Sequence, residues 1–358
     1  MKRVVICLCL LWLGGANAPS QERSIRSTAL SLVHFSLLAG ADCAQIFPCQ
    51  QWKMDKGQWP LWRGAALATQ ANSQMVPNLP LATIQRNFKT LPFKPGEKLT
   101  YELKFTRFPL NAKVGEITFE FVAEANAENW REDFNDLNVP FSPQPGEQFY
   151  RLRASAVSKG IITAIIGYDV NNRYATLVSR EDFAARLHLR EIKEGKKRVR
   201  QSALFEGEQV SYLSNNLANN LNQPEAPAKT KALPRQPASL DLLSAFFFVR
   251  LQKLKEGELI RYPVSDDFEN YSFDIVVGKK EQLKTECGKI KTIRIEPKLF
   301  GKQQLYGREG TMTMWLTDNK QHTPVRMIAK TGGSTISARL LNFKTNCQIA
   351  EPTEEEVK

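Results

Sequence analysis

The chain of 358 residues carries a formal charge of +12, with 42% hydrophobic and 24% charged residues. These proportions are ordinary for a soluble protein and indicate no special compositional class. The length suffices for one large all-β domain or two small ones. A basic chain can associate with anionic lipid headgroups or acidic glycans, although the same charge also fits a soluble protein without a polyanionic partner.

The first 41 residues have the features of an export signal. Met1–Arg3 is a short basic start, Val4–Gly15 is an apolar run, and Ala16–Ala18 offers a small-x-small cleavage site. Pro19 directly after this site usually hinders cleavage. A second apolar run, Ala29–Ala41, lies behind Arg23 and Arg26 and also ends in small residues. Both runs are shorter than the ~20 apolar residues that span a bilayer. We therefore expect a cleaved signal, with an uncleaved anchor as the alternative, and a mature protein in the periplasm or cell envelope.

Four cysteines follow this region, and in an oxidising compartment they can form disulfides. They are Cys43, Cys49, Cys287 and Cys347. Cys43 and Cys49 would close a small loop, and Cys287 and Cys347 would close one of about 60 residues, but the sequence does not fix the pairing. The residues before Cys43 lack the small pair of a lipobox, which disfavours lipidation. The spacing matches no zinc pattern, so no metal site is expected.

Strand patterns dominate the chain from residue 91 onward, after a lead-in over 42–90 that lacks a sustained period and is expected to be poorly ordered. In the stretch 99–105, Leu99, Tyr101 and Leu103 alternate with polar residues, as in a half-buried strand. Similar patterns predict further strands at 114–122, 148–157, 173–180, 186–194, 197–205, 208–214, 258–265, 271–279, 282–296, 309–317, 324–330 and 334–343. A short helix is predicted at 159–167.

The remaining segments complete the predicted architecture. Residues 215–239 are rich in Asn, Pro, Ala and Lys and are expected to form a flexible loop, and 346–358 is an acidic tail. Leu240–Leu254 is the one convincing helix. We predict a mostly β, single domain over 91–345, in which about a dozen strands form an antiparallel curled sheet or barrel and one helix covers or plugs it.

Catalytic motifs are nearly absent. The three histidines, His34, His188 and His322, are scattered, and no metalloprotease, nucleophile-elbow or phosphate-loop motif occurs. No catalytic residue and no cofactor is therefore predicted. Carboxylates on different strands can still meet in space, which keeps a carboxylate-based hydrolase as an alternative. These strand carboxylates are Glu102, Glu116, Glu120, Asp274 and Glu296.

The helix supplies the sharpest clue to a site. Asp241 is placed to be its N-cap, accepting the backbone N–H of Ser244. Arg250 lies about 180° from Asp241, among apolar residues, so it must pair with a strand carboxylate, bind an anion in the barrel cavity, or extend to solvent.

Residues 310–317 place Met side chains on one face and Trp315 on the other, as in a strand between a core and a lumen or semi-exposed surface. We predict Arg250, Tyr101 and Trp315 as the ligand-binding residues. The basic run Lys193–Arg200 is expected at a solvated hairpin tip, and since it lacks interleaved aromatics, no nucleic acid is expected as a partner.

Several stretches, in this order, make the chain resemble the bacterial exported-protein family known as domain of unknown function 3108. They are Phe93–Tyr101, Tyr150–Ala154 with Ser158–Gly160, Asp241–Phe246 with Arg250, Cys287–Lys289 ahead of Ile293–Pro297, and Trp315–Asp318 with Pro324–Arg326. The resemblance covers roughly 90–345. It implies a periplasmic or envelope β-barrel-like domain and brings no catalytic residues.

Together these observations predict a non-enzymatic module of the periplasm or envelope that binds a lipid or glycan in a β-barrel cavity. Peripheral association with the envelope is a further expectation. The alternative to a binding module is a purely structural interaction protein with a filled barrel. The sequence leaves the oligomeric state open.

Overall fold

The computed structural model describes residues 79–86, 88, 90–133, 140–159, 169–216, 227–285, 288–300 and 309–341. Within these ranges the strands are β1 (Glu97–Arg107), β2 (Leu110–Asn126), β3 (Gln148–Ser158), β4 (Asn171–Ser179), β5 (Ala185–Glu194), β6 (Lys197–Glu206), β7 (Gln209–Asn216), β8 (Lys229–Pro234), β9 (Leu259–Asp266), β10 (Glu269–Thr285), β11 (Gly288–Pro297), β12 (Thr311–Thr317), β13 (Pro324–Thr331) and β14 (Ser334–Leu340). The helices are α4 (Leu242–Phe248) and the 3-10 turns η1 (Trp130–Asp133) and η2 (Val249–Leu251).

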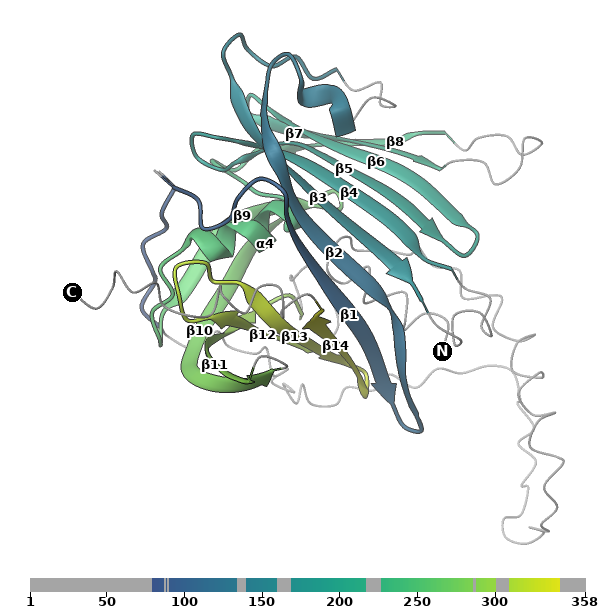
Figure 1. Cartoon of the computed structure of the whole chain (residues 1–358). Helices are drawn as coiled ribbons and strands as arrows, with labels where there is room; N and C mark the ends of the chain where they lie inside the picture. Colours follow the sequence, from purple (N-terminus) through teal and green to yellow (C-terminus); the bar gives the residue numbers. More distant parts are fainter. Residues whose placement is uncertain are drawn as a thin grey trace, which may run out of the picture. The chain divides into compact units, whose positions relative to one another are not determined.

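These strands form one antiparallel sheet in the order β8-β7-β6-β5-β4-β3-β2-β1-β14-β13-β12-β11-β10-β9 (Figure 1). The alternation in the sequence sets the two faces of each strand. In β1, for example, Leu99, Tyr101 and Leu103 are buried, whereas Glu102 and Lys104 point to the opposite face. For the described residues, the predicted mostly β fold with an antiparallel sheet covered by one helix is confirmed.

The sheet is open, because its two edge strands, β8 and β9, do not pair with each other. Both ends of edge strand β9 are covered by short parallel bridges, one from Leu81 to Leu259 and one from Leu240 to Val264. Edge strand β8 is short and carries Lys229 and Lys231, charges that discourage pairing with another chain.

The turn between β9 and β10 connects the two ends of the open sheet through side chains. Phe268 stacks against Tyr212 of β7, with ring centroids 4.9 Å apart, and its carbonyl accepts a 2.7 Å hydrogen bond from Lys231 of β8. Asp267 pairs with Arg190 of β5, and Asp266 lies 3.8 Å from the same guanidinium. The curled sheet is thus held by this turn where strand pairing is absent.

Helix α4 fills the interior of the curled sheet and lies between its β1–β8 part and its β9–β14 part (Figure 1). All seven of its residues are buried, as expected for a helix surrounded by core. Phe246 stacks on Phe119 of β2 at 4.0 Å between ring centroids, and Phe248 meets Tyr262 of β9 edge to face at 5.1 Å. The helix therefore joins both parts of the sheet into one hydrophobic core.

The helix is shorter than predicted. It begins after Asp241, whose carboxylate accepts the N–H groups of Leu243 and Ser244, so the predicted N-cap is confirmed. It gives way to η2 at Val249 and ends at Gln252, whose backbone is extended. The side chain of Gln252 then bonds to the backbone of Gln85 in both directions.

Four other segments differ from their prediction or fall outside the described residues. The strand predicted over 282–296 is a hairpin, because Gly288 has a positive φ of 89° at the turn between β10 and β11. Strand β8 lies within the predicted loop 215–239. The helix predicted at 159–167 lies almost entirely outside the described residues. From the predicted lead-in, Pro80 and Ala82 exchange backbone hydrogen bonds with Leu259.

Of the helices in the described part of the chain, none is long and apolar enough to cross a membrane.

Candidate functional site

Arg250 is fully buried and pairs with Glu97, the first residue of β1. Its Nη1 and Nη2 donate to the two carboxylate oxygens of Glu97 at 2.6 and 3.3 Å, and its Nε donates to the carbonyl of Gln321 at 3.2 Å. The guanidinium carbon also lies 4.9 Å from the ring centroid of Phe93. The sequence left three alternatives for Arg250. The structure shows the first of them, an internal ion pair with a strand carboxylate, that of Glu97.

The three predicted ligand-binding residues do not converge. Tyr101 is buried beside Arg250, and its hydroxyl donates a 2.7 Å hydrogen bond to the carbonyl of Pro324. Burial raises the pKa of this hydroxyl, so it remains a neutral donor. Trp315 lies on the opposite face of the sheet, where its indole N–H donates to Glu281 and Arg326 approaches its ring. Ligand binding by these residues stays a prediction.

A buried polar cluster surrounds the start of α4. His188 Nδ1 lies 2.8 Å from Thr176 Oγ1 and 3.2 Å from the Asp241 carboxylate. Burial by itself would raise the pKa of Asp241, but the attraction of His188 and the hydrogen bonds from His188 and Ser244 lower it overall. These buried groups fix the N-terminus of the helix in the core.

The core of the curled sheet is filled rather than hollow where it is described. Two core cavities, both lined by Leu299 and Met312, have volumes of about 20 and 40 Å³. Such volumes hold one or a few water molecules and cannot accommodate an acyl chain or a sugar ring.

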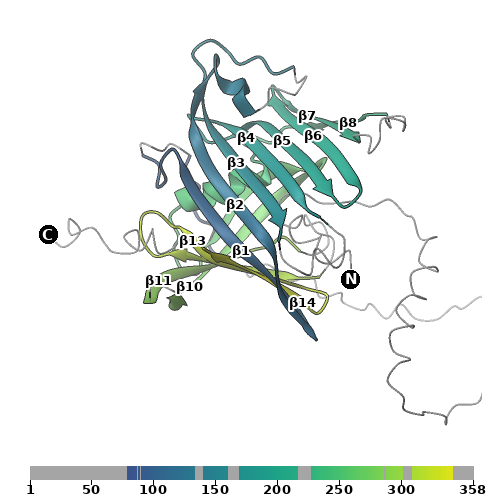
Figure 2. The ribbon, with the colours of Figure 1, turned by 45° about the vertical axis from the view of Figure 1, so that its right-hand side comes forward.

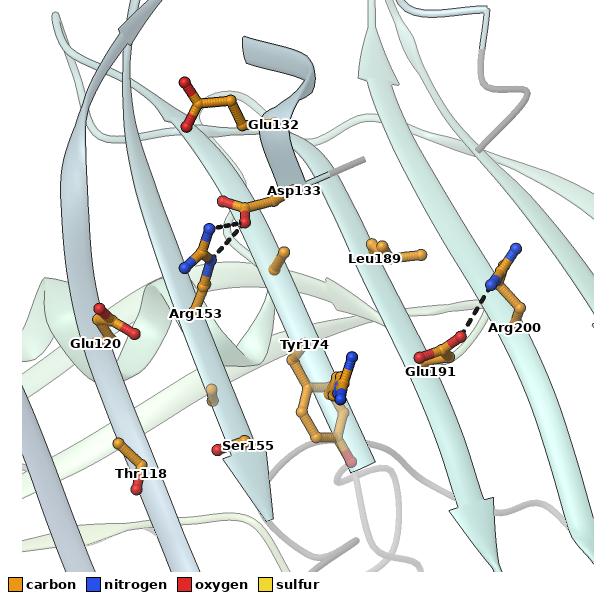
Figure 3. Close-up of a pocket in the computed structure, with 13 residues that line it drawn as sticks. Thr118, Glu120, Glu132, Asp133, Arg153, Ser155, Tyr174, Leu189, Glu191 and Arg200 are labelled. Carbon is orange, nitrogen blue, oxygen red and sulfur yellow. Dashed lines mark hydrogen bonds and ion pairs between the residues drawn. The ribbon is translucent and has the colours of Figure 1, made fainter. Parts of the chain in front are cut away.

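The larger site is a groove of about 580 Å³ on the outer face of β2–β6 (Figure 3). Its position follows from the segment after β2, which folds over this face. Trp130 and Phe141 of that segment pack against Phe149, Leu177 and Leu187 in a second hydrophobic cluster. The turn η1 is thereby held above the sheet and forms a wall of the groove.

Strand register assembles the floor of the groove. One row of directly opposed residues runs across five strands, namely Thr118, Ser155, Arg173, Glu191 and Arg200. A second row consists of Glu120, Arg153, Ala175 and Leu189. Each row collects one residue from each successive strand, so none of these groups is close to the next in the sequence.

Charges of both signs line the groove. Arg153 pairs with Asp133 of η1, and Arg200 pairs with Glu191 at 2.9 Å, as the dashed lines in Figure 3 mark. The hydrogen bond from Arg200 holds the pKa of Glu191 below its usual range, so this carboxylate is ionised at neutral pH.

Two groups in the groove have binding capacity that the described part of the chain does not use. The side chain of Arg173 is exposed and forms no ion pair or hydrogen bond with a described residue. Asp133 Oδ2 is buried and has no hydrogen-bond partner among the same residues. A cationic donor and an anionic acceptor in one groove suit a ligand that carries both acidic and hydroxyl groups.

The strand carboxylates considered above for a hydrolase are engaged in ion pairs. Glu102 and Glu116 share Lys113 at 2.7 and 3.9 Å, and Glu120 pairs with Lys98. Asp274 pairs with Arg261 at 2.6 Å, and Glu296 pairs with Arg294 and Lys298.

Sequence reasoning did not identify the groove. Its one local signal is the set of charged residues on the outward face of consecutive strands. The predicted disulfide residues Cys43, Cys49, Cys287 and Cys347 lie outside the described residues.

Comparisons with known proteins add a solved structure and a family. One similar solved structure is the crystal structure of a beta-barrel-like protein of domain of unknown function DUF1849 from Brucella abortus. It has a TM-score of 0.38 and 11% sequence identity, covering 68% of this chain and 94% of that chain. A search of curated proteins found no match.

The family is found by a sequence model described as protein of unknown function (DUF3108), which matches residues 138–340. The matched range is more than half of the chain. It includes the motifs around Tyr150, Asp241 and Trp315 that carry the resemblance, together with strands β3–β14 and helix α4. The chain therefore belongs to the DUF3108 family of proteins of unknown function.

Proposed function

We propose that this protein is an exported, non-enzymatic binding module of the bacterial cell envelope that holds a glycan in the groove over β2–β6. The observation that carries the proposal is the contrast between this polar groove of about 580 Å³ and the core cavities of about 20 and 40 Å³.

The chemistry of the groove favours a glycan over a lipid. Its floor and wall present carboxylate and hydroxyl groups, which exchange hydrogen bonds with sugar hydroxyls. They also present arginines, which pair with sugar carboxylates. An acyl chain would require an apolar cavity larger than those in the described core. The proposed ligand is therefore a glycan with hydroxyl and carboxylate groups, bound by Arg173 and the free oxygen of Asp133.

The export part of the proposal rests on the sequence. Residues 1–41 have the basic start, apolar runs and small-residue sites of a secretory signal. The envelope compartment supplies glycans of the proposed chemistry, and the basic charge of the chain favours acidic ones.

A purely structural interaction protein is the second candidate, and the filled core supports it. A protein of that kind needs a rigid body rather than a ligand cavity, and α4 packed between the two parts of the sheet provides one. The two candidates differ in whether the groove binds a soluble glycan.

Isothermal titration of the full-length protein with two soluble acidic glycans tests the proposal. The probes are oligogalacturonate and the disaccharide of N-acetylglucosamine and N-acetylmuramic acid. Arg173→Ala should weaken the binding of at least one probe by about tenfold, since one charge-assisted hydrogen bond contributes ~1.5 kcal/mol or more. Lys291→Ala, which removes an exposed cation of β11 outside the groove, should bind as the wild type does. Equal affinities for wild type and Arg173→Ala, or no binding of either probe, would favour the structural protein.

A further inference from the structure

The hairpin between β1 and β2 presents an unusual combination of groups at its tip. The side chain of Phe108 is 97% exposed, and only Leu81 joins it as an exposed large hydrophobic residue in the described part of the chain. Exposed aromatic side chains of this kind are costly in water and are enriched where proteins meet the interfacial region of membranes.

Among the described residues, both neighbouring strands stop pairing before the tip of the hairpin. Strand β3 pairs with β2 only from Gly115 onward, and β14 pairs with β1 only as far as Thr106. Figures 1 and 2 show the hairpin running past the end of β3. Within the described part of the chain, Phe108 therefore lies beyond the paired part of both neighbouring strands.

Cations without carboxylate partners flank the tip. Arg107 precedes Phe108, and Lys104 lies four residues before it, ~13 Å along the strand. Neither side chain forms an ion pair with a described residue. The neighbouring Lys113 is paired with Glu102 at 2.7 Å, so it adds less net charge.

A basic groove extends from Lys104 over the outer face of β1, β14 and β13. Its volume is about 540 Å³, and its charged lining residues are Lys104, Lys284, Arg326, Arg339 and Glu102. Arg326 stands directly opposite Arg339, a pairing of like charges that costs stability unless an anion lies nearby. Glu102, 3.6 Å from Arg339, is the carboxylate that lines this groove.

We propose that the β1–β2 hairpin docks this protein onto the surface of an anionic lipid bilayer. Phe108 enters the interfacial layer, and Arg107, Lys104 and the basic groove contact lipid phosphates. The combination of an exposed aromatic tip with unpaired cations fits a bilayer better than a soluble polyanion, because a polyanion has no apolar layer for Phe108. This surface is separate from the groove over β2–β6, so either proposal can fail alone.

Hydrogen exchange of the full-length protein tests the docking site directly. Exchange is followed by mass spectrometry with and without vesicles of phosphatidylglycerol and phosphatidylcholine. The amides of residues 104–113 should become protected with these vesicles and remain unchanged with phosphatidylcholine alone. Strand β8, which is also basic and exposed, should show no protection. Because the readout is local, attachment through the apolar runs of residues 1–41 cannot produce it.

Variants separate the contributions of the aromatic ring and the charges. Phe108→Ser and Lys104→Glu should each weaken co-sedimentation with the anionic vesicles by about fivefold or more, since each cation near such a surface contributes ~1 kcal/mol. Both should abolish the protection of 104–113. Lys253→Glu makes the same charge change at an exposed position after α4 and should leave the protection intact.

Two outcomes would overturn the proposal. Unchanged exchange at 104–113 in the presence of anionic vesicles would exclude docking through the hairpin. Equal protection by soluble alginate, insensitive to Phe108→Ser, would assign the basic groove to an acidic polysaccharide instead of a membrane.

Discussion

At the scale of single residues, the interior of this protein contains charges that serve the fold. Arg250 has no exposed side-chain surface, whereas its partner Glu97 remains 22% exposed. Water can therefore hydrate the carboxylate if the arginine is removed, but it cannot reach the guanidinium if the carboxylate is neutralised. The two halves of this ion pair should tolerate substitution differently.

Glu97→Gln should lower the free energy of unfolding by about 3–5 kcal/mol, because it leaves a buried cation without a counter-ion. Arg250→Met should cost about 2 kcal/mol or less, since methionine fills apolar space and Glu97 can turn to solvent. Urea denaturation of the wild type and both variants measures the difference. A larger loss for Arg250→Met would show that the arginine contributes mainly through Gln321 and Phe93 rather than through charge.

The sequence predicted some residue roles and missed others for a physical reason. The N-cap role of Asp241 followed from local helix geometry, and the cost of burying a charge left three alternatives for Arg250, of which a carboxylate partner was one. Arg173, Glu191 and Arg200 meet only because strands β4, β5 and β6 pair in one register. That register depends on the whole sheet, so the local pattern around each residue did not reveal the groove.

At the scale of elements, the turn between β9 and β10 and helix α4 hold an open sheet in a curled form. Asp267 and Phe268 of this turn both have positive φ, of 45° and 69°, which costs backbone energy in residues other than glycine. The contacts of Phe268 with Tyr212 and of Asp267 with Arg190 offset that cost. The sequence pattern predicted the two strands but gave no sign that their turn reaches β5 and β7.

The same turn makes stability depend on pH through Asp266. Burial raises the pKa of this carboxyl to about 6, and Arg190 and His188 only partly oppose the rise. Between pH ~4 and ~6 the unfolded chain releases this proton before the folded one does, so the contribution of Asp266 to stability falls as pH rises. Above pH ~6 the loss is complete.

Asp266→Asn removes this titration while keeping the size of the side chain. Relative to the wild type, its free energy of unfolding should rise between pH 4 and 7, by about 3 kcal/mol at most. Urea denaturation of both proteins at unit pH steps measures the difference. A difference that stays constant over this range would mean that Asp266 ionises in the folded protein as it does in the unfolded chain.

At the scale of the whole molecule, period-2 patterning predicted the mostly β architecture and its antiparallel sheet, and the apolar run over 240–254 predicted helix α4. The long antiparallel strands carry that signal strongly, since one face of each is buried. Whether the sheet encloses a cavity was beyond the sequence, because it depends on how Phe246, Phe247 and Phe248 fill the space between β2 and β9. The filled core moves the proposed ligand site from the inside of the sheet to its outer face.

Native mass spectrometry of the full-length protein, gently isolated from the envelope, tests whether the outer groove binds a glycan. A bound mass with carbohydrate composition is expected on the wild type and on Lys291→Ala and should be lost from Arg173→Ala. An apo mass for all three proteins, or a bound lipid that Arg173→Ala retains, would contradict it.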